Sequence, residues 1–259
     1  MILCKTIIQG NLSIVKHFST LLFVKNIIYL DYLGGDYHMI NIWLNINNFS
    51  EPFAFNQLKN VIKPNHRVLI FPFAYHEDYI KTEDEYDAHF SKGCHEIEEI
   101  ITEFSFYGIA RKNIKIAHYF RDTQKSLKNK IYHADILFFT GGYPDRILYR
   151  IDKLNIRKVI QGFTGIIMGT SAGAMIQLDK YHVTPETEND EYDFQFGLGL
   201  LSGFDIEVHY EPNEAHWIGM MRALSEQEAP IYALPNNTGL LIENGEIIHL
   251  GKIYKYSKE

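Results

Sequence analysis

The chain has 259 residues, of which 46% are hydrophobic, 25 are Lys or Arg and 32 are Asp or Glu. This length and apolar content exclude a disordered chain, and the net charge of −7 without a basic run argues against nucleic acid or a membrane surface as a partner. The two cysteines, Cys4 and Cys94, fit neither a disulfide framework nor a zinc site, which favours a cytoplasmic enzyme without a metal.

The first 38 residues differ from the rest in composition, with 21 apolar and only five charged residues. Lys25 separates their longest apolar runs, which are far shorter than the roughly 18 residues of a membrane span, and no secretory signal is visible. We therefore expect residues 1–38 to be an appendage, as a start codon assigned too early would produce, and the functional domain to span 39–259. An amphipathic N-terminal helix or hairpin packed on that domain is the alternative.

From Met39 onward, short β-rich segments alternate with helix-length segments, a pattern typical of βαβ units around a parallel sheet. Ser50-Glu51-Pro52 predicts a helix start, and a longer helix is expected from Asp87 to Tyr107. After Ser171, glycines and asparagines predict strands and hairpins with one helix near Asn213–Leu224. The predicted strands of the α/β sheet are Ile40–Ile46, Arg67–Phe71, Ile114–His118, Ala134–Phe139 and Gly165–Met168.

The segment around Ser171 is the most informative in the chain. A predicted strand runs into the G-x-S-x-G pattern at 169–173, and a helix-compatible segment follows. This is the context of a nucleophile elbow, in which flanking glycines permit a tight turn and the serine hydroxyl is exposed above the sheet. The amide of Ala172 would then stabilise an oxyanion. An ordinary small-residue turn that packs a helix on a sheet is the alternative.

A second oxyanion donor is expected in the turn that follows another predicted strand. The buried strand 134–139 runs into Thr140-Gly141-Gly142-Tyr143-Pro144. In a parallel sheet this turn opens at the same carboxyl edge as the Ser171 turn, so the amides of Gly141 and Gly142 can face the same crevice. A plain strand-to-helix turn, with Pro144 at the first helical position, is the alternative.

Three segments, taken in order, resemble the peptidase S51 family, which contains dipeptidase E and cyanophycinase. They are Thr140–Pro144, Gly169–Ala174, and Gly197–Leu201 running into Val208-His209-Tyr210. The resemblance spans roughly Met39 to the C-terminus. It implies a flavodoxin-like, doubly wound, mostly parallel sheet of the class I glutamine amidotransferase-like type, with serine in place of the amidotransferase cysteine. It also implies a serine peptidase of small peptides, with aspartyl dipeptides suggested by dipeptidase E.

By position in these motifs, Ser171 matches the family's nucleophile and His209 its catalytic histidine. Histidine is the side chain whose ordinary pKa suits a general base near neutral pH. Dipeptidase E carries its acid between these two residues. Here Glu186 is the candidate by distance from Ser171 and Asp190 by local similarity, and a solvated acidic loop is the alternative for both. Where some relatives have an acid after a Leu-Pro pair, this chain has Asn236.

The resemblance to dipeptidase E suggests the substrate, and the G-x-S-x-G pattern leaves alternative functions open. An aspartyl side chain requires a cation in its pocket, and the candidates are Arg146, Lys180 and His182, with Arg222 as a further one. No cofactor or metal is expected, since the chain lacks a Walker A sequence and a complete dinucleotide fingerprint. A small peptide is the expected partner of a monomer or homodimer. The alternatives are an α/β-hydrolase esterase with a later histidine, such as His249, and a non-catalytic amidotransferase-like module that binds a ligand.

Overall fold

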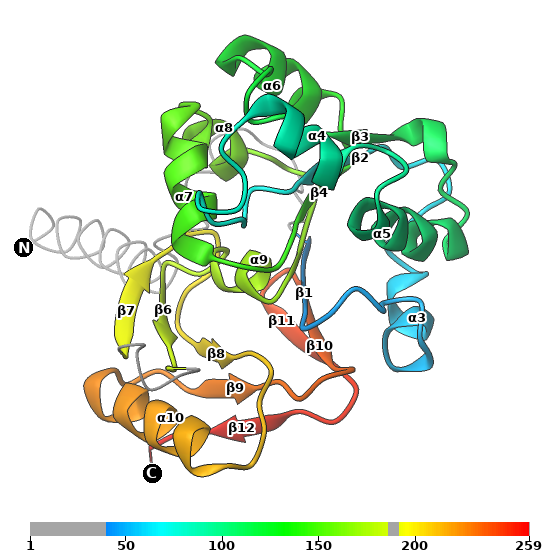
Figure 1. The fold of residues 1–259 in the computed structure, drawn as a ribbon. Coiled ribbons are helices and arrows are strands. Elements are labelled where there is room, and N and C mark those ends of the chain that lie inside the picture. The colour runs from blue at the N-terminus through cyan, green and yellow to red at the C-terminus, as the bar shows by residue number, and fades with distance from the viewer. Residues whose placement is uncertain (1–39, 186–191, 259) are drawn as a thin grey trace, which may run out of the picture. The chain divides into compact units, whose positions relative to one another are not determined.

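The computed structural model describes residues 40–185 and 192–258 of the chain, and its central feature is a seven-stranded sheet (Figure 1). The strand order is β11 (Glu246–Leu250), β10 (Gly239–Glu243), β1 (Ile40–Leu44), β5 (Ile166–Thr170), β4 (Ile136–Phe139), β2 (Val68–Phe71) and β3 (Ile114–Ile116). The strands from β1 to β3 in this order pair in parallel, while β10 and β11 are antiparallel to their neighbours. The predicted α/β fold with a mostly parallel sheet is thereby confirmed. The expectation for residues 1–38 lies outside the described residues.

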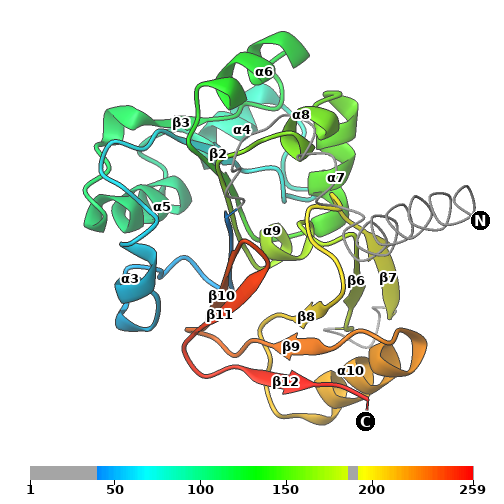
Figure 2. The same cartoon turned by 180° about the vertical axis from the view of Figure 1, so that it is seen from behind.

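The central strands are mostly apolar, and helices cover both faces of the sheet. In β2, Val68 and Ile70 enter the core on one face, and Leu69 and Phe71 enter the core on the other. The first core is closed by α3 (Pro52–Leu58) and α5 (His95–Phe106). The second core is closed by α6 (Gln124–Tyr132), α7 (Pro144–Lys153) and α8 (Arg157–Gln161), as the two opposite views show (Figures 1 and 2).

The single helix expected from Asp87 to Tyr107 is wrong, because two helices occupy this region. The first, α4, spans Glu83–Phe90, and α5 begins only at His95. Between them the backbone is extended at Ser91 and has a φ of +108° at Gly93, a value that helical backbone does not adopt. The apolar periodicity that predicted the helix belongs to α5 alone.

The C-terminal part of the described chain forms two small sheets beside the large one (Figure 2). One sheet contains β12 (Tyr254–Tyr256), β9 (Ile231–Ala233) and β8 (Asp205–Glu207), and the other pairs β6 (Lys180–Val183) with β7 (Asp193–Phe196). The expected helix near Asn213–Leu224 is present as α10 (Glu214–Glu226). Within 40–185 and 192–258, no helix combines the length and apolar character needed to cross a membrane.

A buried ionic network joins β6, β8 and α10. The His182 imidazole lies between two carboxylates, with Nδ1 2.7 Å from Asp205 Oδ2 and Nε2 2.6 Å from Glu207 Oε2, and Glu207 also contacts His216. Carboxylates accept but do not donate when ionised, so both ring nitrogens carry a proton. Burial by itself lowers the pKa of His182, but the two carboxylates outweigh it and raise this pKa to about 10. A charged histidine therefore belongs to the folded state.

We expect the free energy of unfolding to decrease as the pH rises from about 6.5 to about 10. The folded pKa of His182 lies above its unfolded value, so its contribution is complete below the unfolded pKa and is lost as the imidazolium deprotonates. Urea unfolding across this pH range measures the effect. His182→Gln removes the titrating group and should flatten the profile, whereas the exposed His133→Gln should leave it unchanged. Parallel profiles for wild type and His182→Gln would contradict this assignment.

Candidate active site

Ser171 occupies a strained turn at the carboxyl edge of the large sheet, between β5 and α9 (Ala172–Met175). Its backbone has φ of 49° and ψ of −115°, which L-residues rarely adopt. The turn is tight because glycines flank the serine. A Cβ on Gly173 would lie 2.2 Å from the carbonyl oxygen of Phe139. A Cβ on Gly169 would lie 2.1 Å from the carbonyl oxygen of Gly173. The two glycines of the G-x-S-x-G pattern are therefore required by the close approach of the backbone at this turn.

Gly173→Ala should destabilise the fold by about 1–3 kcal/mol or more, because the new methyl group meets backbone atoms that cannot move aside. Urea unfolding provides the measurement. Gly162→Ala is the matched control, since its Cβ would come no closer than 3.4 Å to a neighbour and its φ is −92°. Equal stability losses in the two variants would contradict the close approach at the serine turn.

His209 completes a hydrogen-bonded pair with the serine. It lies two residues beyond β8, and its Nε2 is 2.9 Å from the Ser171 hydroxyl oxygen. Its Nδ1 is 3.0 Å from Oδ1 of Asn236. An amide oxygen only accepts hydrogen bonds, so this contact requires a proton on Nδ1, and in the neutral ring the Nε2 lone pair then faces the serine hydroxyl. This is the tautomer that a base acting on Ser171 requires.

The partner of His209 Nδ1 was missed as an orienting residue by sequence reasoning. Asn236 lies in the turn after β9 and is exposed. Its signal in the sequence was the preceding Leu234-Pro235 pair, after which some relatives carry an acid. The two predicted acids, Glu186 and Asp190, lie outside the described residues.

The expected oxyanion donors gather beside the serine. A Cβ on Gly141 would lie 3.3 Å from Ser171 Cβ, which brings the glycine turn against the nucleophile. Gly142 has a φ of +129°, and a Cβ there would lie 2.4 Å from the Ala74 carbonyl oxygen, so only glycine fits. In the part of the chain that the structure describes, the amides of Gly141, Gly142 and Ala172 donate to no backbone carbonyl. They are thus available to a ligand.

A cavity of about 1120 Å³ opens beside Ser171 and His209. Its walls come from the loop after β1, the segment 74–80, the glycine turn and the facing parts of α4 and α5. The α5 wall carries four glutamates: Glu96, Glu98, Glu99 and Glu103. Burial raises the pKa of Glu103, although its carboxylate accepts the Ser50 amide at 2.6 Å. Neither lysine nor arginine is among the described residues that line this cavity.

The residues expected to bind an aspartyl side chain lie elsewhere in the structure. Arg146 Nε is 3.3 Å from a carboxylate oxygen of Glu77, and the Lys180 ammonium lies 3.7 Å from the centre of the Phe194 ring. His182 is enclosed in the ionic network of β6 and β8. None of these three basic residues lines the cavity beside Ser171.

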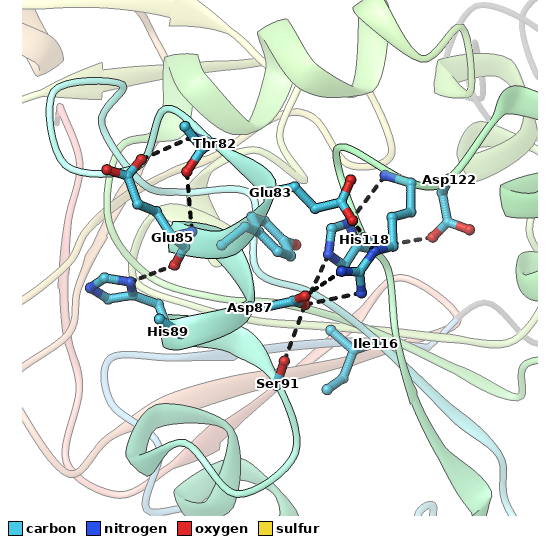
Figure 3. A network of polar contacts seen from close by, with 12 residues as sticks. Thr82, Glu83, Glu85, Asp87, His89, Ser91, Ile116, His118 and Asp122 are labelled. Carbon is cyan, nitrogen blue, oxygen red and sulfur yellow. Dashed lines mark hydrogen bonds and ion pairs between the residues drawn. The ribbon is translucent and has the colours of Figure 1, made fainter.

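The α4 wall of the cavity is held by a second polar network (Figure 3). Asp87 accepts from His118 Nε2 at 3.1 Å, from the Ser91 hydroxyl at 3.2 Å and from the guanidinium of Arg121. Arg121 also donates to Glu83, one turn earlier on α4, at 2.5 Å. These contacts fix α4 to the loop after β3, so the C-terminal end of α4 forms a fixed part of the cavity wall.

The family model of peptidase family S51 matches residues 47–250, a range that contains Ser171, His209 and Asn236. This chain belongs to peptidase family S51. Among solved structures, a protein from Listeria monocytogenes EGD-e assigned as a peptidase E superposes with a TM-score of 0.54 at 14% identity, covering 86% of this chain and 100% of that one. A peptidase from an acI-B1 Actinobacterium gives 0.53 at 13% identity, with 87% and 100% covered. None of the curated proteins matches the sequence.

The two solved structures share the fold of this chain, although only about one residue in seven is identical. The mostly parallel sheet is the fold that this chain shares with them, over the greater part of its length.

Proposed function

We propose that this member of peptidase family S51 is a serine peptidase that hydrolyses small peptides with Ser171, His209 and Asn236. The observation that carries the proposal is the 2.9 Å contact between the Ser171 hydroxyl and His209 Nε2 at the edge of a cavity. A serine hydroxyl is a weak nucleophile at its ordinary pKa, and a base within hydrogen-bond distance activates it. In its neutral form, an imidazole whose Nδ1 proton is held by Asn236 directs its Nε2 lone pair toward that hydroxyl.

In the proposed mechanism, His209 Nε2 takes the hydroxyl proton while Ser171 Oγ bonds to the scissile carbonyl carbon. The carbonyl π electrons move to its oxygen, and the amides of Gly142 and Ala172 donate to that oxyanion, with Gly141 beside them. As the carbon–nitrogen bond breaks, the imidazolium returns its proton to the leaving amine. Water, deprotonated by the same histidine, then attacks the acyl ester and releases Ser171.

The dimensions and charge of the cavity bear on the substrate. Its volume of about 1120 Å³ lies slightly above the range of roughly 300–1,000 Å³ that is typical of small-ligand sites. A peptide of several residues therefore fits. An aspartyl side chain would need a cation, and the described lining residues include neither lysine nor arginine. The proposal is accordingly for small peptides, and the aspartyl preference stays an expectation from the resemblance to dipeptidase E.

Ser171→Ala should reduce hydrolysis of a peptide panel by about 10³-fold or more and abolish labelling by a fluorophosphonate. His209→Ala should slow both reactions, because the hydroxyl then has no base. Ser225→Ala and His249→Ala are the controls, since Ser225 is exposed on α10 and His249 lies on the edge strand β11. A decisive loss with His249→Ala instead would favour the esterase alternative. Absence of labelling in the wild type would favour a ligand-binding module.

The neutral side chain of Asn236 makes a separate prediction about the pH profile. Asn236→Asp places a carboxylate beside His209 Nδ1, which favours the imidazolium, so the acidic limb of kcat/KM should move to higher pH. Asn236→Ala should lower kcat by about 10²-fold because the ring loses its orientation and tautomer. Initial rates between about pH 5 and pH 9 test both variants. An Asn236→Ala enzyme with the wild-type kcat and profile would remove Asn236 from the mechanism.

A further inference from the structure

Asn45 stands directly after β1, at the sheet edge that carries Ser171, and its side chain is nearly inaccessible, with the residue 2% exposed. Its Oδ1 accepts the backbone amide of His209 at 3.1 Å. Its Nδ2 donates to the carbonyl oxygens of Leu234 and Pro235, each at 2.6 Å. A primary amide has two donor hydrogens and one acceptor oxygen, and each of these has a partner here. The orientation of the amide is unambiguous, since a backbone N–H only donates and a carbonyl only accepts.

These three hydrogen bonds join the two loops that carry the proposed base and its orienting partner. His209 follows β8, and Leu234-Pro235 directly precedes Asn236. The same loops contact each other through the Tyr210 amide, which donates to the Leu234 carbonyl at 2.9 Å. Asn45 is therefore bonded to one residue of the base loop and to two residues of the orienting loop.

The backbone of His209 needs such support, because its φ is +53°. A non-glycine residue in this region is disfavoured and persists where neighbouring groups hold it. The bond from the His209 amide to Asn45 fixes the peptide plane from which the imidazole projects toward Ser171. One residue earlier, the Leu44 carbonyl accepts the Ser171 amide at 2.8 Å. The end of β1 thus contacts the loops of all three residues of the proposed mechanism.

We propose that Asn45 is a positioning residue, which sets the distance and alignment of His209 relative to Ser171 by holding the His209 and Asn236 loops together. The proposal rests on the serine peptidase function put forward above. Asn45 takes no part in the proton transfer itself. Loss of the Asn45 side chain should lower kcat, because a displacement of the reacting groups by about 1 Å lowers the rate about 10²-fold.

Two variants and a matched control test this role in the full chain. Asn45→Ala removes all three hydrogen bonds, and Asn45→Asp keeps the shape but turns an anionic oxygen toward two carbonyls. The control is Asn41→Ala, a fully buried asparagine within β1 whose amide donates instead to Gln177 at 2.8 Å. All proteins are assayed where urea titration shows them folded. Asn45→Ser, which retains one hydroxyl, replaces any variant that does not fold.

We expect both Asn45 variants to lose about 10²-fold in kcat and in the rate of fluorophosphonate labelling, with KM within about threefold of wild type. Asn41→Ala should lose stability but keep kcat within about threefold. ¹⁵N signals of the His209 ring give a readout besides activity, and they should move from the Nδ1-protonated tautomer toward an average in the Asn45 variants only.

The proposal is overturned if the Asn45 variants lose no more kcat than Asn41→Ala, or if their His209 ring signals match those of wild type. An effect confined to KM also overturns it, since that result would assign Asn45 to substrate binding. Failure of the serine peptidase function is distinguished from these outcomes, because the wild type itself would then neither hydrolyse peptides nor react with the fluorophosphonate.

Discussion

The parallel pairing of β1 with β5 is the interaction on which the rest of the site depends. Its register sets Leu44 opposite Thr170, so the two strands end together and their next residues, Asn45 and Ser171, emerge at one edge. β4 pairs with the other side of β5 and brings the Gly141 turn to the same edge. Because side chains alternate between faces along a strand, a shift of one residue in this pairing would turn Ser171 away from the cavity. Ser171, the glycine turn and Asn45 are therefore all placed at this edge by the pairing of the parallel strands.

The small three-stranded sheet carries the proposed base, His209, and its partner, Asn236. His209 and Asn236 lie in the turns after β8 and β9. These two strands pair with each other in the small sheet and not with the seven-stranded one. The buried ionic network of His182 ties β8 to β6 and α10, at the cost of enclosing charges that must stay paired. We therefore expect the stability of the β6, β8 and α10 region to depend on pH. The position of His209 depends on this region, whereas Ser171 follows β5 of the large sheet.

A neutral amide beside the proposed base has a chemical consequence. An aspartate at this position would orient the imidazole and also stabilise the imidazolium that forms during proton transfer. Asn236 can orient the ring and select its tautomer, but it brings no charge. The proposed mechanism therefore depends more on fixed geometry than on electrostatic stabilisation of a protonated His209. The strained backbones of Ser171 and His209, both with positive φ, agree with such a fixed arrangement.

Local patterns in the sequence determined the parallel α/β architecture, the turn at Ser171 and the glycines beside it, because strand periodicity and close backbone approach depend on neighbouring residues. His209 was identified from the sequence only through a family resemblance. The break at Gly93 and the role of Asn236 required the tertiary structure. Asn236 lies 65 positions after Ser171, and the sequence pattern pointed to Glu186 or Asp190 as the acid, so only the contact between two distant turns places Asn236 beside His209. The sequence does not distinguish Asn41 from Asn45, since both are asparagines in or next to one strand. Only the tertiary structure shows that Asn45 bonds to the two turns, while Asn41 bonds to Gln177.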